Sequence, residues 1–174
     1  MSIRYALLGV LASGPAHGYD LKHEHDRRFP GAKPLAYGQV YSSLGRLERD
    51  GLVEVVETSQ VGGPERTTYA LTAAGEQALT EWLTTPEPAG PYPADELVRK
   101  AVTALHVGQD AADFLVEQRE THLARMRELV LVQAGLNEPE ARVAIDHTIY
   151  HLDADLRWLE TATARVAAKR VGQR

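Results

Sequence analysis

One continuous run, residues 35–71, most constrains the fold, because a helical pattern passes there directly into a β pattern. Its first apolar positions recur at spacings of four, three and four residues, which predicts one buried helical stripe: Val40, Leu44, Leu47 and Gly51. A β pattern follows at 52–56, in which Val53, Val55 and Val56 are β-branched, and a Gly-Gly-Pro turn at 62–64 separates it from a second β pattern at 67–71. The run therefore predicts a helix that is followed at once by a β-hairpin.

Two further helices are predicted upstream of this run. Apolar spacing marks a helix over residues 3–11, closed by Ser13-Gly14-Pro15, and a second helix over residues 17–28. Three helices followed by a hairpin form a winged helix-turn-helix, a unit that typically docks double-stranded DNA with its third helix in the major groove. The alternatives are an ordinary α+β domain without a nucleic-acid partner and a winged helix that binds protein.

The order and spacing of six short segments resemble the PadR family of transcriptional regulators. These segments are residues 7–11 (LLGVL), 14–22 (GPAHGYDLK), 38–41 (GQVY), 44–53 (LGRLERDGLV), 62–66 (GGPER) and 71–75 (LTAAG). Each fragment is weak by itself, but the combination is specific. The resemblance covers roughly the first half, and it implies that His17 orders a turn. The second half fits the branch with a long C-terminal helical domain in length and layout rather than in motif.

Polar side chains on the predicted third helix are the candidates for reading DNA. Gln39, Ser42 and Ser43 are short enough to reach base edges, and glutamine can bond adenine through two hydrogen bonds. Arg46 lies further along the helix, which favours a phosphate contact. These four residues are the predicted DNA contacts of the third helix.

Further phosphate contacts are predicted next to these four residues. Tyr37 and Tyr41 stand at the start of the third helix, where phenol groups can reach phosphate oxygens, and the family resemblance marks Tyr41 as a hallmark position. Core packing with a satisfied hydroxyl is the alternative for both tyrosines. Lys22 in the second helix and Arg66 in the hairpin are predicted to hold the DNA backbone.

Composition limits the remaining classes of function. The net charge is −5, so a basic footprint on DNA must be local, and dimerisation is expected to supply affinity. Zero cysteines exclude disulfides and thiolate zinc sites. Since no nucleophile elbow, phosphate-binding loop or metalloprotease motif is present, no enzyme, cofactor or metal site is predicted. Without an apolar run of membrane-spanning length or a signal peptide, a cytoplasmic, nucleoid-associated protein is expected.

A proline-rich stretch divides the chain into two predicted domains. We expect a DNA-binding domain at residues 1–85, a semi-rigid linker at 86–93 and an all-helical domain at 94–174. The last helix carries a heptad seam, which predicts a two-fold dimer contact: Ile145, Ile149, Leu152, Leu156 and Leu159. Packing of the seam against helices of the same chain is the alternative.

A second face of the last helix gathers His147, His151 and Trp158. Packing against the middle helix is the plainest interpretation, an effector pocket that also includes Phe114 is the second, and a metal site is the weakest. The family resemblance implies small aromatic or drug-like effectors that release DNA.

The fold class expected is mainly α with a small β wing: an N-terminal winged helix-turn-helix and a C-terminal all-helical dimerisation domain. The resemblance implies a homodimeric, sequence-specific DNA-binding regulator. We expect a repressor that a small molecule releases from a near-palindromic double-stranded operator. A winged-helix adaptor that binds protein but not DNA is the alternative.

Overall fold

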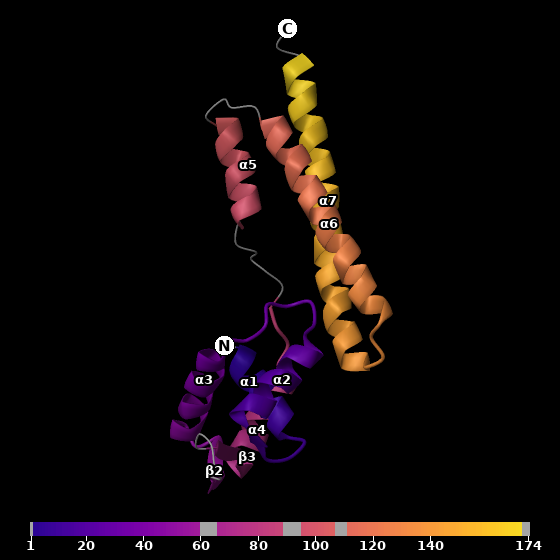
Figure 1. Cartoon of the computed structure of the whole chain (residues 1–174). Coiled ribbons are helices and arrows are strands. Elements are labelled where there is room, and N and C mark those ends of the chain that lie inside the picture. The colour runs from indigo at the N-terminus through magenta and orange to yellow at the C-terminus, as the bar shows by residue number, and fades with distance from the viewer. Residues whose placement is uncertain (1, 60–65, 89–94, 107–110, 172–174) are drawn as a thin grey trace. The chain divides into compact units, whose positions relative to one another are not determined.

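The computed structural model describes residues 2–59, 66–88, 95–106 and 111–171 of the chain (Figure 1). The chain forms two compact units, Met1–Pro88 and Ala89–Arg174. Most of the predicted linker, and the predicted turn at residues 62–64, lie outside the described residues. Among the helices in these ranges, none is both long and apolar enough to span a lipid bilayer.

The first unit is a helical bundle closed by a small antiparallel sheet. Its elements in chain order are α1 (Ser2–Leu11), β1 (Ala16–His17), α2 (Gly18–Arg28), α3 (Tyr37–Arg49), β2 (Val53–Ser59), β3 (Arg66–Leu71) and α4 (Ala73–Thr84). The strand order is β1-β3-β2, with β3 in the centre. This arrangement confirms the predicted winged helix-turn-helix. The two-residue strand β1 was not predicted.

The core of the first unit comes from the apolar stripes of its helices. The largest fully buried side chains there are Leu7, Leu8, Leu21, Val40, Leu44, Leu47 and Val53. At the rim, the rings of Tyr5 in α1 and Trp82 in α4 stack with centroids 5.2 Å apart. Gly51 follows the end of α3 with a φ of +72°, a left-handed conformation that costs glycine little. It is exposed, so the prediction that it belongs to the buried stripe is wrong, and its role is to end the helix.

Thr72 and Gly75 fasten the start of α4 to the end of α3. The Thr72 hydroxyl donates to the Gly51 carbonyl at 2.7 Å and accepts from the Gly75 amide at 3.1 Å, as an N-cap residue does. The Thr72 amide donates to the carbonyl of Leu52 at 3.2 Å. A Cβ on Gly75 would lie 2.0 Å from that Leu52 oxygen, so only glycine fits at this crossing.

The second unit consists of three helices, as predicted: α5 (Glu96–His106), α6 (Ala111–Ala134) and α7 (Pro139–Val171). α6 and α7 pack along each other over much of their length (Figure 1). The buried cluster of this unit contains Ala101, Ala111, Leu115, Leu159 and Val166. One polar contact that ties α6 to α7 is a hydrogen bond from the Gln133 amide to the Asp146 carboxylate.

Two of the five residues in the heptad seam of α7 are buried inside the single chain. Ile145 and Leu159 are fully buried, and Leu159 belongs to the cluster shared with α5 and α6. Ile149, Leu152 and Leu156 are only partly covered. The seam contributes to packing within the chain because α6 is long enough to cover it. This corrects the prediction that Ile145 and Leu159 meet a partner subunit.

Candidate nucleic-acid interface

α3 presents one polar face to solvent. We use the name polar face of α3 for five of its exposed residues: Tyr37, Gln39, Tyr41, Ser42 and Arg46. Glu48 and Arg49, in the last turn of the helix, are exposed as well. The side chains are positioned because the opposite face of the helix is held in the core by Val40, Leu44 and Leu47. All five residues were predicted from the sequence to lie at a DNA contact.

Ser43 departs from the prediction. It is only 7% exposed, and it lies on the buried side of α3 beside Val40, Leu44 and Leu47. The apolar stripe of a packed helix is more than one residue wide, and position 43 falls within it. Ser43 is therefore removed from the residues able to reach a base edge.

The polar face has its own hydrogen bonds along the helix. The Arg46 guanidinium donates to the Ser42 carbonyl at 3.1 Å and to the Ser42 hydroxyl at 3.3 Å. Both of these acceptors are uncharged, so these two hydrogen bonds do not neutralise the positive charge of Arg46. Gln39 accepts a weak bond, 3.4 Å, from the Ala36 amide at the start of the helix.

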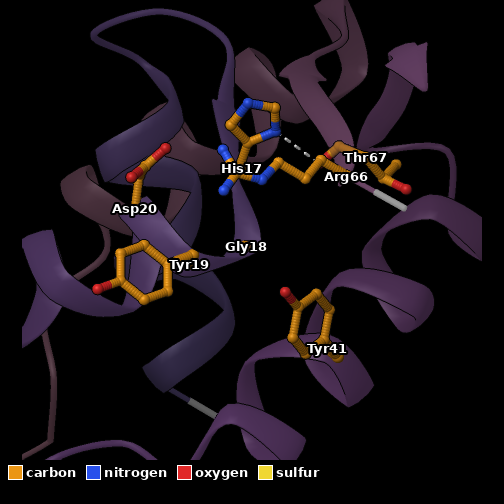
Figure 2. Close-up of a pocket in the computed structure, with 7 residues that line it drawn as sticks. All are labelled: His17, Gly18, Tyr19, Asp20, Tyr41, Arg66 and Thr67. Atoms are coloured by element: carbon orange, nitrogen blue, oxygen red, sulfur yellow. Dashed lines mark hydrogen bonds between the residues drawn. The ribbon is translucent and has the colours of Figure 1, made fainter. Parts of the chain in front are cut away.

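A cavity of about 400 Å³ opens between α3, the start of α2 and β3 (Figure 2). It is lined by His17, Gly18, Tyr19, Asp20, Tyr41, Arg66 and Thr67. Figure 2 shows the Tyr41 ring on α3 facing the α2 start at Gly18, across the space from Arg66. The cavity thus joins two predicted phosphate contacts, Tyr41 and Arg66, that lie 25 residues apart in sequence.

The start of α2 is shaped to accept the Tyr41 ring. A Cβ on Gly18 would lie 2.7 Å from Cε1 of Tyr41, which is closer than two carbons can approach. His17 anchors the same turn, since its Nδ1 lies 3.2 Å from both the Thr67 carbonyl and the Thr68 hydroxyl. The His-Gly dipeptide at 17–18 carries these constraints. Its motif signalled a turn, but the contact with Tyr41 could not be seen in the sequence.

Lys22 is not a free cation. Its ammonium donates to Asp26 at 2.6 Å, and it lies 5.2 Å from the centre of the Tyr37 ring. The hydrogen bond to Asp26 raises the pKa of Lys22 above its usual value. Asp26 also accepts from the Leu35 amide at 3.0 Å, so this pair fixes the entry into α3.

Tyr37, which Lys22 approaches, packs among other ring side chains at the junction of α2 and α3. Tyr37 stacks on Tyr19 with ring centres 5.9 Å apart, and its hydroxyl lies 3.4 Å from Nε2 of His23. Tyr37 is nevertheless 42% exposed. Its phenol is therefore oriented by α2 and still open to a partner.

Other cations of α2 are also compensated. Glu24 receives bonds from both Arg27 and Arg28 at 2.8–2.9 Å. The hydrogen bonds from Arg27 and then Arg28 outweigh the effect of burial and lower the pKa of Glu24 to about 2. The basic footprint of this unit consequently depends on Arg46 and Arg66 more than on α2.

The second unit contains a separate cavity of about 310 Å³ between its three helices. Its lining is mainly apolar and includes Ala101, Val102, Leu105, Leu115, Trp158, Thr161, Ala162, Arg165 and Val166. Trp158 was predicted to line such a pocket. Phe114 packs instead against the buried cluster, and His147 and His151 are not among the lining residues. Of the four residues predicted to line an effector pocket, only Trp158 lines this cavity.

Comparison with known proteins gives a match to one family. The model of the transcriptional regulator PadR-like family matches residues 7–81, a segment that contains the polar face of α3 and the cavity beside it. Over these residues the chain is similar to that family. Within it, the negative transcriptional regulator PadR of Bacillus subtilis is 28% identical over 128 residues, which cover 73% of this chain and 70% of that protein.

A probable transcriptional regulator of Mycobacterium tuberculosis is 27% identical over 86 residues, covering 49% of this chain and 46% of that protein. Among solved structures, Bacillus subtilis PadR in complex with operator DNA has a TM-score of 0.78 at 24% identity, over 95% of this chain and 99% of that chain. The Vibrio cholerae virulence activator AphA has a TM-score of 0.70 at 24% identity, over 96% and 99%. These likenesses extend over both units, so the solved structures share the fold of the winged helix and of the helical unit that follows it.

Proposed function

We propose that this chain is a homodimeric, sequence-specific repressor that binds double-stranded operator DNA through the first unit and is released by a small molecule. The polar face of α3, next to Arg66 across an open cavity, is the observation that carries the proposal. The match of residues 7–81 to the PadR-like family supports it, and a protein of similar fold was solved in complex with operator DNA.

Roles within the interface follow from exposure and charge. Gln39 and Ser42 read base edges, because they are exposed and short on the face that a major groove would meet. Arg46 and Arg66 contact phosphates with charges that no carboxylate in the described contacts neutralises. Lys22 acts chiefly by positioning Tyr37, since Asp26 already holds its ammonium.

Phenol groups complete the backbone contacts. Tyr37 and Tyr41 are 42% and 51% exposed, and each hydroxyl can donate to a phosphate oxygen. Gly18 keeps the Tyr41 ring close to the start of α2. We therefore assign Tyr37 and Tyr41 to the phosphates that flank the bases read by α3.

Dimerisation is assigned to exposed apolar side chains of the second unit. Leu131, Val143 and Tyr150 are each more than 70% exposed, which is costly for a monomer in water. The partly covered seam residues Ile149, Leu152 and Leu156 can contribute at the margin. Sedimentation of Tyr150→Glu tests this assignment: a monomer is expected, and an unchanged dimer would move the interface elsewhere.

The effector is assigned to the cavity lined by Trp158. Its volume of about 310 Å³ suits a small, mainly apolar molecule, and Arg165 supplies one positive charge at the wall. A relative of the same fold was solved with p-coumaric acid, a small aromatic acid. We propose the domain limits 1–85 and 94–174 with a linker at 86–93, a cytoplasmic location and no catalytic activity.

An adaptor without DNA binding is the second candidate. The net charge of −5 and the exposed Val55 and Val56 on β2 favour it, because a wing with apolar side chains suits a protein surface. The two functions differ in the response to salt. Only DNA binding releases counterions and weakens steeply as salt rises.

Fluorescence anisotropy separates the candidates. Full-length protein is titrated against DNA from upstream of its own gene and against random DNA, over a series of salt concentrations. Selective binding with a steep salt dependence is expected. The absence of any salt-dependent affinity for either DNA would favour the adaptor and refute the proposed repressor.

A further inference from the structure

Two histidines of α7 face each other on the surface of the second unit. His147 and His151 are one helical turn apart, both are exposed, and their Nε2 atoms lie 3.2 Å from each other. The ring centres are 4.4 Å apart with a tilt of 54°. Because the nitrogens are closer together than the ring centres, the Nε2 edges of the two rings face each other.

The two Nε2 atoms are close enough to share one hydrogen bond. A neutral imidazole carries a proton on only one of its nitrogens, so one ring must donate from Nε2 and the other must accept. This hydrogen bond therefore requires the two rings to be in different tautomers. A cation that accepts both lone pairs at once satisfies this arrangement without requiring unequal tautomers.

The spacing fits a metal ion that bridges the two rings. With bonds of about 2.0–2.1 Å to each nitrogen, a separation of 3.2 Å corresponds to an N–metal–N angle of about 100°. This angle lies between the right angle of an octahedral site and the tetrahedral angle of about 109°.

Neighbouring carboxylates of α7 are engaged elsewhere. Asp146 accepts from Gln133, Asp153 pairs with Arg157 at 2.9 Å, and Asp155 lies 3.9 Å from Nε2 of His122. Within the described ranges no cluster of three or more potential ligands occurs. The pair is therefore a two-ligand site, whose other coordination positions are open to water.

We propose that His147 and His151 form a surface binding site for a borderline divalent transition-metal ion, of the class of Ni²⁺, Cu²⁺ and Zn²⁺. Imidazole ligands suit these ions, whereas Mg²⁺ and Ca²⁺ prefer oxygen. The site is separate from the polar face of α3 and from the Trp158 cavity, so it adds to the proposed repressor function and does not depend on it.

Isothermal titration of untagged, full-length protein with Ni²⁺ tests the site. The variants are His147→Gln and His151→Gln, and the matched control is His106→Gln, which removes a single exposed histidine of α5. Loss of an outer-shell partner alone weakens metal sites about 10–100-fold, so loss of either ligand is expected to weaken Ni²⁺ binding at least about tenfold. The control and the wild type should bind alike, and Mg²⁺ should not bind.

Thermal unfolding gives a second readout. Ni²⁺ should raise the midpoint for the wild type and His106→Gln, because ligand binding to the folded state stabilises it, but not for either α7 variant. Circular dichroism should be unchanged by the substitutions, since both side chains are exposed. Equal Ni²⁺ affinity in all four proteins, or no binding by the wild type, would overturn the proposal.

Discussion

Replacement of Gly75 by alanine tests how α4 is joined to the rest of the first unit. The added Cβ would lie 2.0 Å from the Leu52 carbonyl oxygen and 2.8 Å from Cδ2 of Leu71. The oxygen is a backbone atom and cannot rotate away. The start of α4 must therefore move outward, which weakens both the Thr72 amide bond to Leu52 and the Thr72 cap of α4.

The magnitude follows from three contributions. Forcing a methyl group into a packed contact costs up to about 3 kcal/mol. Loss of an N-cap costs about 1 kcal/mol, and alanine returns about 1 kcal/mol through its helix propensity. The net loss is about 3 kcal/mol, which lowers the unfolding midpoint of a unit of this size by roughly 10–20 °C.

The measurement uses tryptophan fluorescence during thermal unfolding. Of the two tryptophans, Trp82 lies in α4 and Trp158 in the second unit, so a Trp158→Phe background reports on the first unit alone. The matched control is Gly45→Ala in α3, where a Cβ meets nothing within 4 Å. Alanine there should stabilise by up to about 1 kcal/mol. If Gly75→Ala unfolds at the same temperature as Gly45→Ala, the packing argument is refuted.

Three further predictions concern the interface and α2. Gly18→Ala should displace the Tyr41 ring and weaken DNA binding while the helix content stays the same. Anisotropy measures the affinity and circular dichroism the helix content. Unaltered affinity would mean that Tyr41 does not contact DNA. Gln39→Ala should relax specificity at one base pair, whereas Ser43→Ala should leave specificity unchanged, a contrast measured with single-base operator variants. The pKa of Glu24 is lowered to about 2, so its ion pairs stabilise the fold above the unfolded pKa near 4.5, and this stability is lost as the pH falls toward 2. Glu24→Gln should remove that pH dependence of the free energy of unfolding. The change should be below about 1 kcal/mol, because the ion pairs face solvent. Identical acid unfolding curves for the wild type and the variant would contradict this prediction.

The winged helix could be predicted because its signals are local. The spacing of Val40, Leu44 and Leu47 fixed the buried side of α3, and Gly51 marked its end. Ser43 was misplaced because its residue type suggested a polar role, while its position in the helical repeat put it beside the core. Burial depends on position as well as on polarity.

The parts that could not be predicted depend on partners distant in sequence. β1 has two residues and exists because β3 pairs with it, through Ala16 with Tyr69 and His17 with Thr68. The seam of α7 was identified as an apolar face, but periodicity does not reveal which surface covers it. In the structure Ile145 and Leu159 are fully buried within the single chain, in which α6 packs along α7.

The position of β2 has a consequence for solubility. In the strand order β1-β3-β2, this strand lies at an edge of the sheet that the structure describes, where unpaired backbone groups could recruit a strand from another molecule. Glu54 and Glu57 place charge along the strand, and an irregularity in its pairing with β3 falls between Val55 and Glu57. Charge and irregular pairing are two of the features that discourage edge-to-edge aggregation, so these glutamates protect a wing whose exposed valines would otherwise favour association.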